Sequence, residues 1–158
     1  LHGKGQKAIC YFSGGTSEKN KPDYEDYKKA GVFFSEKSSY GNYYIDIRKL
    51  DKLRPLLKNR FRRAYNYGCD GVEVDSIGVH SHVNTITKND TINFAKMLSE
   101  IAHAQNISVG LKNTSSLVGT LEPYFDFAVV ESCAAFSNEC NSFEMFTKHD
   151  KAVFVVHY

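Results

Sequence analysis

Two carboxylates, Glu73 and Asp75, lie in residues 71–76, a stretch whose other residues predict a short buried strand. A parallel strand covered on both faces is expected to be almost entirely apolar, so two acids within six residues need an explanation. Either Glu73 pairs with a basic neighbour and Asp75 caps the next element, or the end of the strand belongs to an active site. Carboxylates gather both at sites and in ion-pair networks, so this stretch alone leaves both explanations open.

Polar residues also follow the other predicted strands, at 7–12, 108–111, 127–130 and 152–156. These residues are Ser13, the pair Lys112 and Asn113, then Glu131, and finally His157. The carboxyl ends of parallel strands meet on one edge of a sheet or barrel, where α/β enzymes build their sites. Two carboxylates on separate strands, Asp75 and Glu131, suit general acid/base or nucleophilic work such as glycoside hydrolysis. The alternative is two solvated acids at the beginnings of loops.

Other chemistries find less support. His80 and His82 form a His-x-His pair that could bind a metal together with Asp75, Glu131 or His157, but they fall in a polar loop at 77–88, where histidines are more often surface residues. We therefore expect no metal and no cofactor. Ser13 lacks the Gly-x-Ser-x-Gly context of a serine nucleophile.

Aromatic residues are abundant, with 10 Tyr and 11 Phe. Most are expected in the core, but Tyr11, Tyr43, Tyr44 and Tyr158 are placed where they could stack on sugar rings.

Helical patterns alternate with the strands, at 22–30, 50–64, 90–102, 117–125 and 141–148, and further short strands are predicted at 32–34 and 44–48. This alternation predicts a parallel α/β fold, as a single domain over residues 1–158. Asp51 and Asp90 are expected to cap the second and third helices, and Asn106 to end the third. Four basic residues on the second helix are interpreted as solvated surface: Lys58, Arg60, Arg62 and Arg63.

The composition excludes some classes of function. The 158 residues have a formal net charge of +2, with basic residues scattered along the chain, so we expect no nucleic-acid partner. No apolar run is long enough for a transmembrane helix, so no membrane association is expected. Of four cysteines, Cys133 and Cys140 could close a short loop, although Cys10 and Cys69 leave three pairings open. Three N-glycosylation sequons, at Asn89, Asn106 and Asn113, add to an expectation of an oxidising compartment.

Seven short motifs in order resemble glycoside hydrolase family 114, the endo-α-1,4-polygalactosaminidases, over nearly the whole chain. The motifs are residues 10–15 (Cys-Tyr-Phe-Ser-Gly-Gly), 46–48 (Asp-Ile-Arg), 70–75 (Asp-Gly-Val-Glu-Val-Asp), 109–113 (Val-Gly-Leu-Lys-Asn), 131–133 (Glu-Ser-Cys), 139–140 (Glu-Cys) and 151–154 (Lys-Ala-Val-Phe). The resemblance implies a (β/α)8 barrel of the TIM type, and retaining hydrolysis of α-1,4 links in a galactosamine-containing polysaccharide.

By motif position the resemblance implies that Asp75 is the nucleophile and Glu131 the general acid/base. Glu73 would lie one layer deeper and orient Lys112 or Arg48. Cys133 and Cys140 match a cysteine pair of the family, and family members are generally secreted. The expected substrate-binding residues are Tyr11, Ser13, Asp46, Arg48, Glu73, Lys112, Asn113, His157 and Tyr158.

The chain departs from the family pattern in three respects. The family usually has Pro and then Asp-Asn where this chain has Val74, Asp75 and Ser76, and it commonly has an acid where this chain has His157. Only six or seven βα units are predicted, so we expect a fragment that lacks the first and last barrel strands. These departures keep a second hypothesis open, a catalytically inactive secreted carbohydrate-binding protein with the same barrel.

Overall fold

The computed structural model describes residues 1–158 and contains one five-stranded parallel sheet. The strands are β1 (Ile9–Ser13), β4 (Gly71–Asp75), β5 (Ser108–Lys112), β6 (Phe127–Glu131) and β7 (Ala152–Val156), in the spatial order β1-β4-β5-β6-β7. All four pairings are parallel, as the alternating strand and helix pattern predicts. The α/β fold is therefore confirmed.

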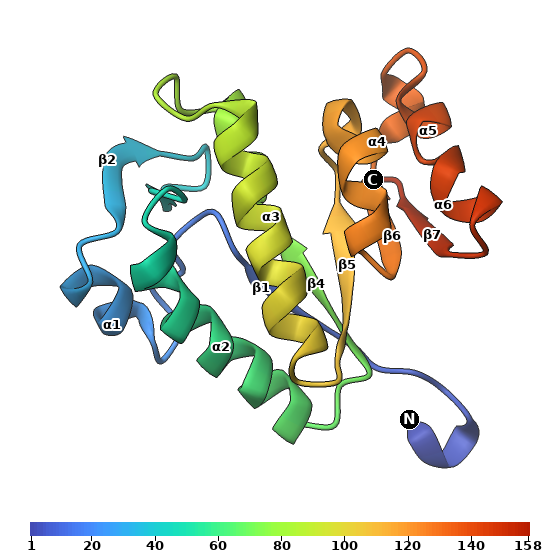
Figure 1. Ribbon diagram of the computed structural model, residues 1–158, viewed down its shortest axis with the longest axis horizontal. Helices are drawn as coiled ribbons and strands as arrows, with labels where there is room; N and C mark the ends of the chain where they lie inside the picture. Colours follow the sequence, from blue (N-terminus) through green and yellow to red (C-terminus); the bar gives the residue numbers. More distant parts are fainter.

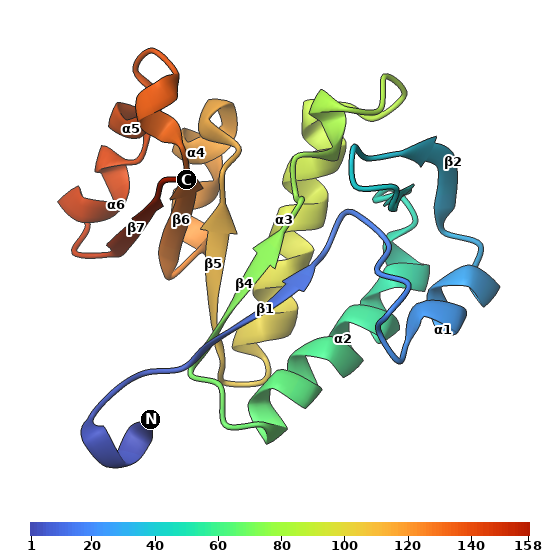
Figure 2. The same ribbon diagram turned by 180° about the vertical axis from the view of Figure 1, so that it is seen from behind.

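Helices connect the strands. Their bounds are α1 (Tyr24–Lys29), α2 (Leu50–Asn66), α3 (Lys88–His103), α4 (Val118–Leu121), α5 (Glu139–Ser142) and α6 (Glu144–Lys148), with 3-10 turns at His2–Lys4, Val79–Ser81, Ser115–Leu117, Glu122–Tyr124 and Cys133–Ala135. Figure 1 views the side on which α2, α3 and α4 cover the sheet, and Figure 2 shows the strands from the opposite side, with no helix over them. None of the helices combines the length and the apolar character needed to cross a bilayer.

Two of the predicted strands do not join the parallel sheet. Strands β2 (Phe33–Lys37) and β3 (Tyr43–Ile45) pair with each other as an antiparallel hairpin. The five residues between them can close a hairpin, with Gly41 in the left-handed region at φ 77°. They are too few for the crossover that a parallel pair needs. The prediction of six or seven βα units was thus too high, because the parallel sheet has five strands.

Helix caps differ in detail from the prediction. Thr87, not Asp90, caps α3: the Thr87 side chain accepts from the backbone of Asp90, whose carboxylate bonds back to Thr87 in a capping box. Asp51 lies inside the first turn of α2, where its charge suits the helix dipole, and does not cap it. Asn106 has φ 54° just beyond α3, as expected for a helix terminator.

The two faces of the sheet have different chemistry. Val72, Val74, Val109 and Leu111 are fully buried and belong to the core cluster that also contains α2 and α3 residues. By the alternation of side chains along a strand, the residues between them point to the opposite face. That face carries Tyr11, Glu73, Asp75, Lys112 and Glu131 near the carboxyl ends of their strands.

Below these polar residues the same face is apolar. Phe127 packs edge-on against Phe154, with ring centroids 5.9 Å apart. The Phe127 ring lies over Gly110, where a Cβ atom would come closer than 3.0 Å to three ring carbons. Gly110 is therefore required by packing, because any side chain there would displace the Phe127 ring.

Replacing Gly110 with Ala should lower the free energy of unfolding by about 1–3 kcal/mol, the usual cost of overpacking a core. Gly119 in α4 is the matched control, since a Cβ atom there would meet nothing within 4 Å. Gly119→Ala should be neutral or stabilising by up to about 1 kcal/mol, because Ala favours a helix. Urea unfolding of the two variants checks the difference, and equal midpoints would contradict it.

Candidate active site

The ammonium group of Lys112 lies between three carboxylates at the carboxyl end of the sheet. Its Nζ atom is 3.0 Å from Glu73 Oε1, 3.2 Å from Asp75 Oδ1 and 3.3 Å from Glu131 Oε1. The Lys112 side chain is only 2% exposed. Burial alone would lower the pKa of Lys112, but the charges of Asp75 and Glu73 outweigh it and raise the pKa above its usual value. Lys112 is therefore a permanent cation at neutral pH.

Asp75 is held by donors on both of its oxygen atoms. The Tyr11 hydroxyl donates to Oδ2 at 2.7 Å, while the backbone N–H of Ser76 donates to Oδ1 at 2.7 Å beside Lys112. Burial and the hydrogen bond to Asp75 raise the pKa of Tyr11 well above its ordinary value, so the phenol keeps the proton that it donates. This set of donors holds the carboxylate in a fixed orientation.

Only one carboxylate oxygen of Glu131 has protein contacts. Its Oε1 atom accepts from the Tyr158 hydroxyl at 2.8 Å and contacts Lys112, whereas no side chain or backbone donor reaches Oε2. The backbone N–H of Glu131 donates to Asn113 Oδ1 at 2.9 Å, which ties the end of β6 to the end of β5. Asn113 adopts φ 49°, a conformation that Asn tolerates better than most residues.

Glu73 lies one layer deeper than Asp75 on the same face of β4, as the strand period requires. It contacts Lys112 and not Arg48, so of the two partners that the sequence suggests, the structure places Lys112 beside it. Glu73 does not line the cleft described next.

A cleft of about 670 Å³ opens above this cluster and is lined by Tyr11, Ser13, Asp75, Lys112, Asn113 and Glu131 among the predicted site residues. Sequence reasoning did not place most of its other lining residues in a site: Thr16, Glu18, Ser38, Ser39, Tyr40, Asn42, Ser76, Ile77, Gly78, Ser81 and Thr114. Most of these are small and polar residues of loops. Only their position after strand ends could have indicated them.

The hairpin of β2 and β3 forms one wall of the cleft. Tyr40 in its loop is 90% exposed, and Tyr44 stacks on the His82 ring with centroids 5.4 Å apart. Tyr44 was an expected sugar-stacking residue and lines the cleft. Tyr43, another such candidate, instead stacks on Phe33 within the hairpin.

Besides Glu73, four further expected substrate-binding residues do not line the cleft: Asp46, Arg48, His157 and Tyr158. Asp46 is buried and pairs with Arg48 through two hydrogen bonds of 2.8 and 3.0 Å just after β3. His157 is exposed after β7. Tyr158 contributes only indirectly, through its hydrogen bond to Glu131. Ser13 borders the cleft, but its hydroxyl is buried and shares a hydrogen bond with Thr16.

The two loop histidines have protein contacts of their own. His80 Nδ1 is 2.9 Å from the Thr91 hydroxyl, and His82 stacks on Tyr44. Burial lowers the pKa of His80, helped by the charge of Lys88, which favours the neutral ring.

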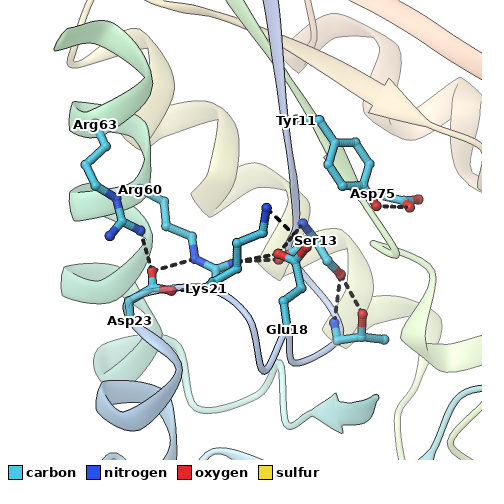
Figure 3. Close-up of polar contacts among 9 residues, drawn as sticks. Tyr11, Ser13, Glu18, Lys21, Asp23, Arg60, Arg63 and Asp75 are labelled. Carbon is cyan, nitrogen blue, oxygen red and sulfur yellow. Dashed lines mark hydrogen bonds and ion pairs between the residues drawn. The ribbon is translucent and has the colours of Figure 1, made fainter. Parts of the chain in front are cut away.

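A buried ion cluster fixes the end of β1 next to Asp75 (Figure 3). Arg60 Nη1 donates to the backbone carbonyl of Ser13 at 2.7 Å, and Glu18 accepts from the Ser13 N–H at 3.2 Å. Arg60 also binds both oxygens of Asp23, at 2.8 and 3.0 Å. The interpretation of Arg60 as solvated surface was wrong: it lies on the apolar side of α2 because this cluster supplies the partners that a buried charge needs.

Two disulfides are present, Cys133–Cys140 and Cys10–Cys69. The first closes the short loop after β6 that the cysteine spacing suggested. The second joins β1 to the turn before β4, a pairing that the sequence had left open. Both lie in or beside elements that carry site residues.

The charged Lys112 should stabilise the folded protein at neutral pH, and this contribution should be lost at alkaline pH. Because its folded pKa exceeds the unfolded value of about 10.4, the contribution is complete below that pH and is lost as the pH rises through the folded value. The difference in unfolding free energy between wild type and Lys112→Met should therefore stay constant from pH 7 to about 9 and shrink above about 10.4. Lys58→Met, which alters an exposed lysine, should show no such trend.

The Arg60 cluster should be important for stability. Arg60→Met leaves Asp23 buried without its main partner, so unfolding free energy at pH 7 should fall by about 3–5 kcal/mol. The exposed neighbour Arg62 is the control, and Arg62→Met should change stability by no more than about 0.5 kcal/mol.

The same cluster predicts a dependence on acid pH. Burial would raise the pKa of Asp23, but Arg60 and Arg63 lower it overall. The resulting stability is present above the unfolded pKa of about 3.9 and lost as the pH falls through the folded value. The gap between wild type and Arg60→Met should thus narrow below about pH 4, and a constant gap would contradict this account.

Comparison with known proteins supports one family. The family model for "Glycoside-hydrolase family GH114" matches residues 1–158. Among solved structures, Aspergillus fumigatus Ega3 in complex with galactosamine aligns at a TM-score of 0.90 and 32% identity, over 100% of this chain and 63% of that chain. The chain thus spans under two thirds of Ega3. A search of curated proteins found no match.

A more distant similarity shows the fold alone. The glycoside hydrolase domain of PelA from Pseudomonas aeruginosa aligns at a TM-score of 0.69 and 13% identity, over 96% of this chain and 67% of that domain. The parallel sheet, the motif order and the family match over every residue lead to one conclusion: the chain belongs to glycoside hydrolase family 114.

Proposed function

We propose that this chain is the part of an endo-acting glycosidase that carries its two catalytic carboxylates, and that the substrate is an α-1,4-linked galactosamine polymer. The observation that carries the proposal is the contact of both Asp75 and Glu131 with the Lys112 ammonium at the base of the cleft. The galactosamine bound in the Ega3 structure supports the choice of sugar. We also propose that residues 1–158 form one domain. The two disulfides favour a protein that acts outside the cell.

The spacing of the two carboxylates favours retention of configuration. Asp75 Oδ1 and Glu131 Oε1 contact one nitrogen at 3.2 and 3.3 Å, so these two oxygens can be no more than about 6.5 Å apart. We infer from this limit that the carboxyl groups have the closer spacing of retaining enzymes. Inverting enzymes need the wider gap to place a water molecule between sugar and base. The narrower gap suits direct attack by one carboxylate on the anomeric carbon.

The contacts also favour one order of roles. Asp75 is held by Tyr11, Lys112 and Ser76, and its Oδ2 atom, which accepts only from Tyr11, keeps a lone pair for attack. Glu131 has a free Oε2 that can carry a proton. Asp75 would form a bond to the anomeric carbon while the glycosidic bond breaks and Glu131 protonates the departing oxygen. Water would then attack that carbon, lose its proton to Glu131 and release Asp75.

Asp75→Asn and Glu131→Gln should each lower turnover of de-N-acetylated galactosaminogalactan by about 10²–10⁴-fold, because each removes one of the two reacting groups. Reducing-end release measures the rate, and nuclear magnetic resonance of the first product should show the α anomer. Asp126→Asn is the control, since Asp126 accepts from the Val109 N–H at the opposite end of β5 and should leave turnover within about twofold.

Azide distinguishes the two roles. With Asp75→Gly it should attack from the vacated side and give a β-glycosyl azide, whereas with Glu131→Ala it should open the covalent intermediate and give an α-glycosyl azide. The reverse outcome would exchange the roles. Binding of the polymer without turnover by the folded wild type would reject the enzyme and favour the inactive carbohydrate-binding protein.

A further inference from the structure

A second groove borders the cleft on its β5–β6 side. It is lined by Ser115 and Ser116 of the turn after β5 and by residues of the loop after β6, with a volume of about 370 Å³. Thr114 lines the cleft and its neighbour Ser115 lines the groove, so the two share a border. Strands β5 and β6 also carry Lys112 and Glu131. The groove is thus positioned to receive the continuation of a chain bound over those residues.

The groove combines one aromatic ring with uncommitted polar groups. Phe136 is 62% exposed, which is high for a side chain of its size and apolar character. The side chains of Ser115, Ser116, Ser137 and Glu139 make no hydrogen bond or ion pair within the protein. An exposed ring surrounded by free hydroxyls and a carboxylate is suited to a sugar, whose apolar face stacks and whose polar groups need partners.

The loop that carries Phe136 is constrained by a disulfide. Cys133 is fully buried, and its bond to Cys140 ties the far end of the loop to the core. The Phe136 N–H donates to the Cys133 carbonyl at 3.2 Å, and Asn138 takes the left-handed conformation at φ 61°. Constraining the loop backbone before binding reduces the entropy that a ligand must offset.

From these observations we propose that the groove is a distal subsite for the galactosamine polymer, beyond the sugars held at Asp75 and Glu131. Phe136 stacks on the pyranose ring, and the Glu139 carboxylate pairs with the ammonium group of a de-N-acetylated unit. The inference rests on the proposed substrate. It assigns to the loop between Cys133 and Cys140 a role in binding long chains, separate from bond cleavage.

The test uses α-1,4-linked galactosamine oligosaccharides from the disaccharide to the decasaccharide. Phe136→Ala should lower kcat/KM about tenfold for the longest oligosaccharides and leave the shortest unchanged, since one stacking contact is worth on the order of a tenfold change in affinity. Phe136→Tyr, which keeps the ring, should behave as wild type. Thermal unfolding should be the same for all three proteins, because the ring is exposed.

Binding provides a second measurement that needs no turnover. In the Asp75→Asn background, calorimetry should show the same loss of affinity for long oligosaccharides on replacing Phe136 with Ala. Glu139→Gln should weaken binding of de-N-acetylated oligosaccharides and leave fully N-acetylated ones unaffected.

The outcomes separate the two proposals. Wild type that cleaves no oligosaccharide rejects the proposed function, and the calorimetric comparison still tests the groove. Wild type that favours long chains while Phe136→Ala loses nothing, or loses equally at every length, rejects the distal subsite.

Discussion

The Lys112 ammonium is the interaction on which the site depends. A buried cation is tolerated only with close partners, and Lys112 has three, each from the polar face of the sheet. Glu73 and Asp75 come from β4, Glu131 from β6, and Lys112 from the strand between them. The parallel register places Asp75 level with Lys112, Glu73 one layer deeper and Glu131 one layer higher, all on the same face of the sheet. A shift of the strand register by one residue would move these side chains to the opposite face. The ion cluster around Lys112 therefore depends on the register of the parallel strands.

The rest of the sheet supports this polar layer from two sides. Apolar side chains on the opposite face pack on α2 and α3 and fix the strands. Below the carboxylates, the Phe127 ring covers Gly110 and closes the layer with apolar carbon. Lys112 is thus reached from the cleft alone. Its low exposure and the partial exposure of the carboxylates follow from this layering.

The edges of the site are held by separate means. At β1 the buried Arg60 and the partly exposed Glu18 bind the backbone of Ser13, whose strand also carries Tyr11, the donor to Asp75. At β6 the Cys133–Cys140 disulfide fixes the loop that follows Glu131. Both groups lie outside the proposed catalytic pair, yet each limits how far one carboxylate can move relative to the other. The proposed distal groove lies on the same disulfide-closed loop, so the Cys133–Cys140 bond would support both cleavage and chain binding.

The sequence by itself determined the parallel α/β fold, the family, and the strand-end positions of Asp75, Lys112 and Glu131. The family followed from the resemblance of seven motifs in order. The fold and the strand-end positions could be predicted because strand periodicity and turn residues are local signals, and because parallel strands bring their carboxyl ends together. It failed for Arg60, read as surface, and for the segments at 32–34 and 44–48, read as further parallel strands. The partners of Arg60 lie 37 to 47 residues away in the chain, so no local sequence pattern indicates them.

Only the tertiary structure decided which polar residues face the cleft. Asp46 and Arg48 pair with each other outside the cleft, and Glu73 lies beneath it. The hairpin loop that contains Tyr40 forms one wall of the cleft. The physical reason is that a motif specifies residue types and spacing, whereas access to a ligand depends on how loops distant in sequence pack over the strand ends.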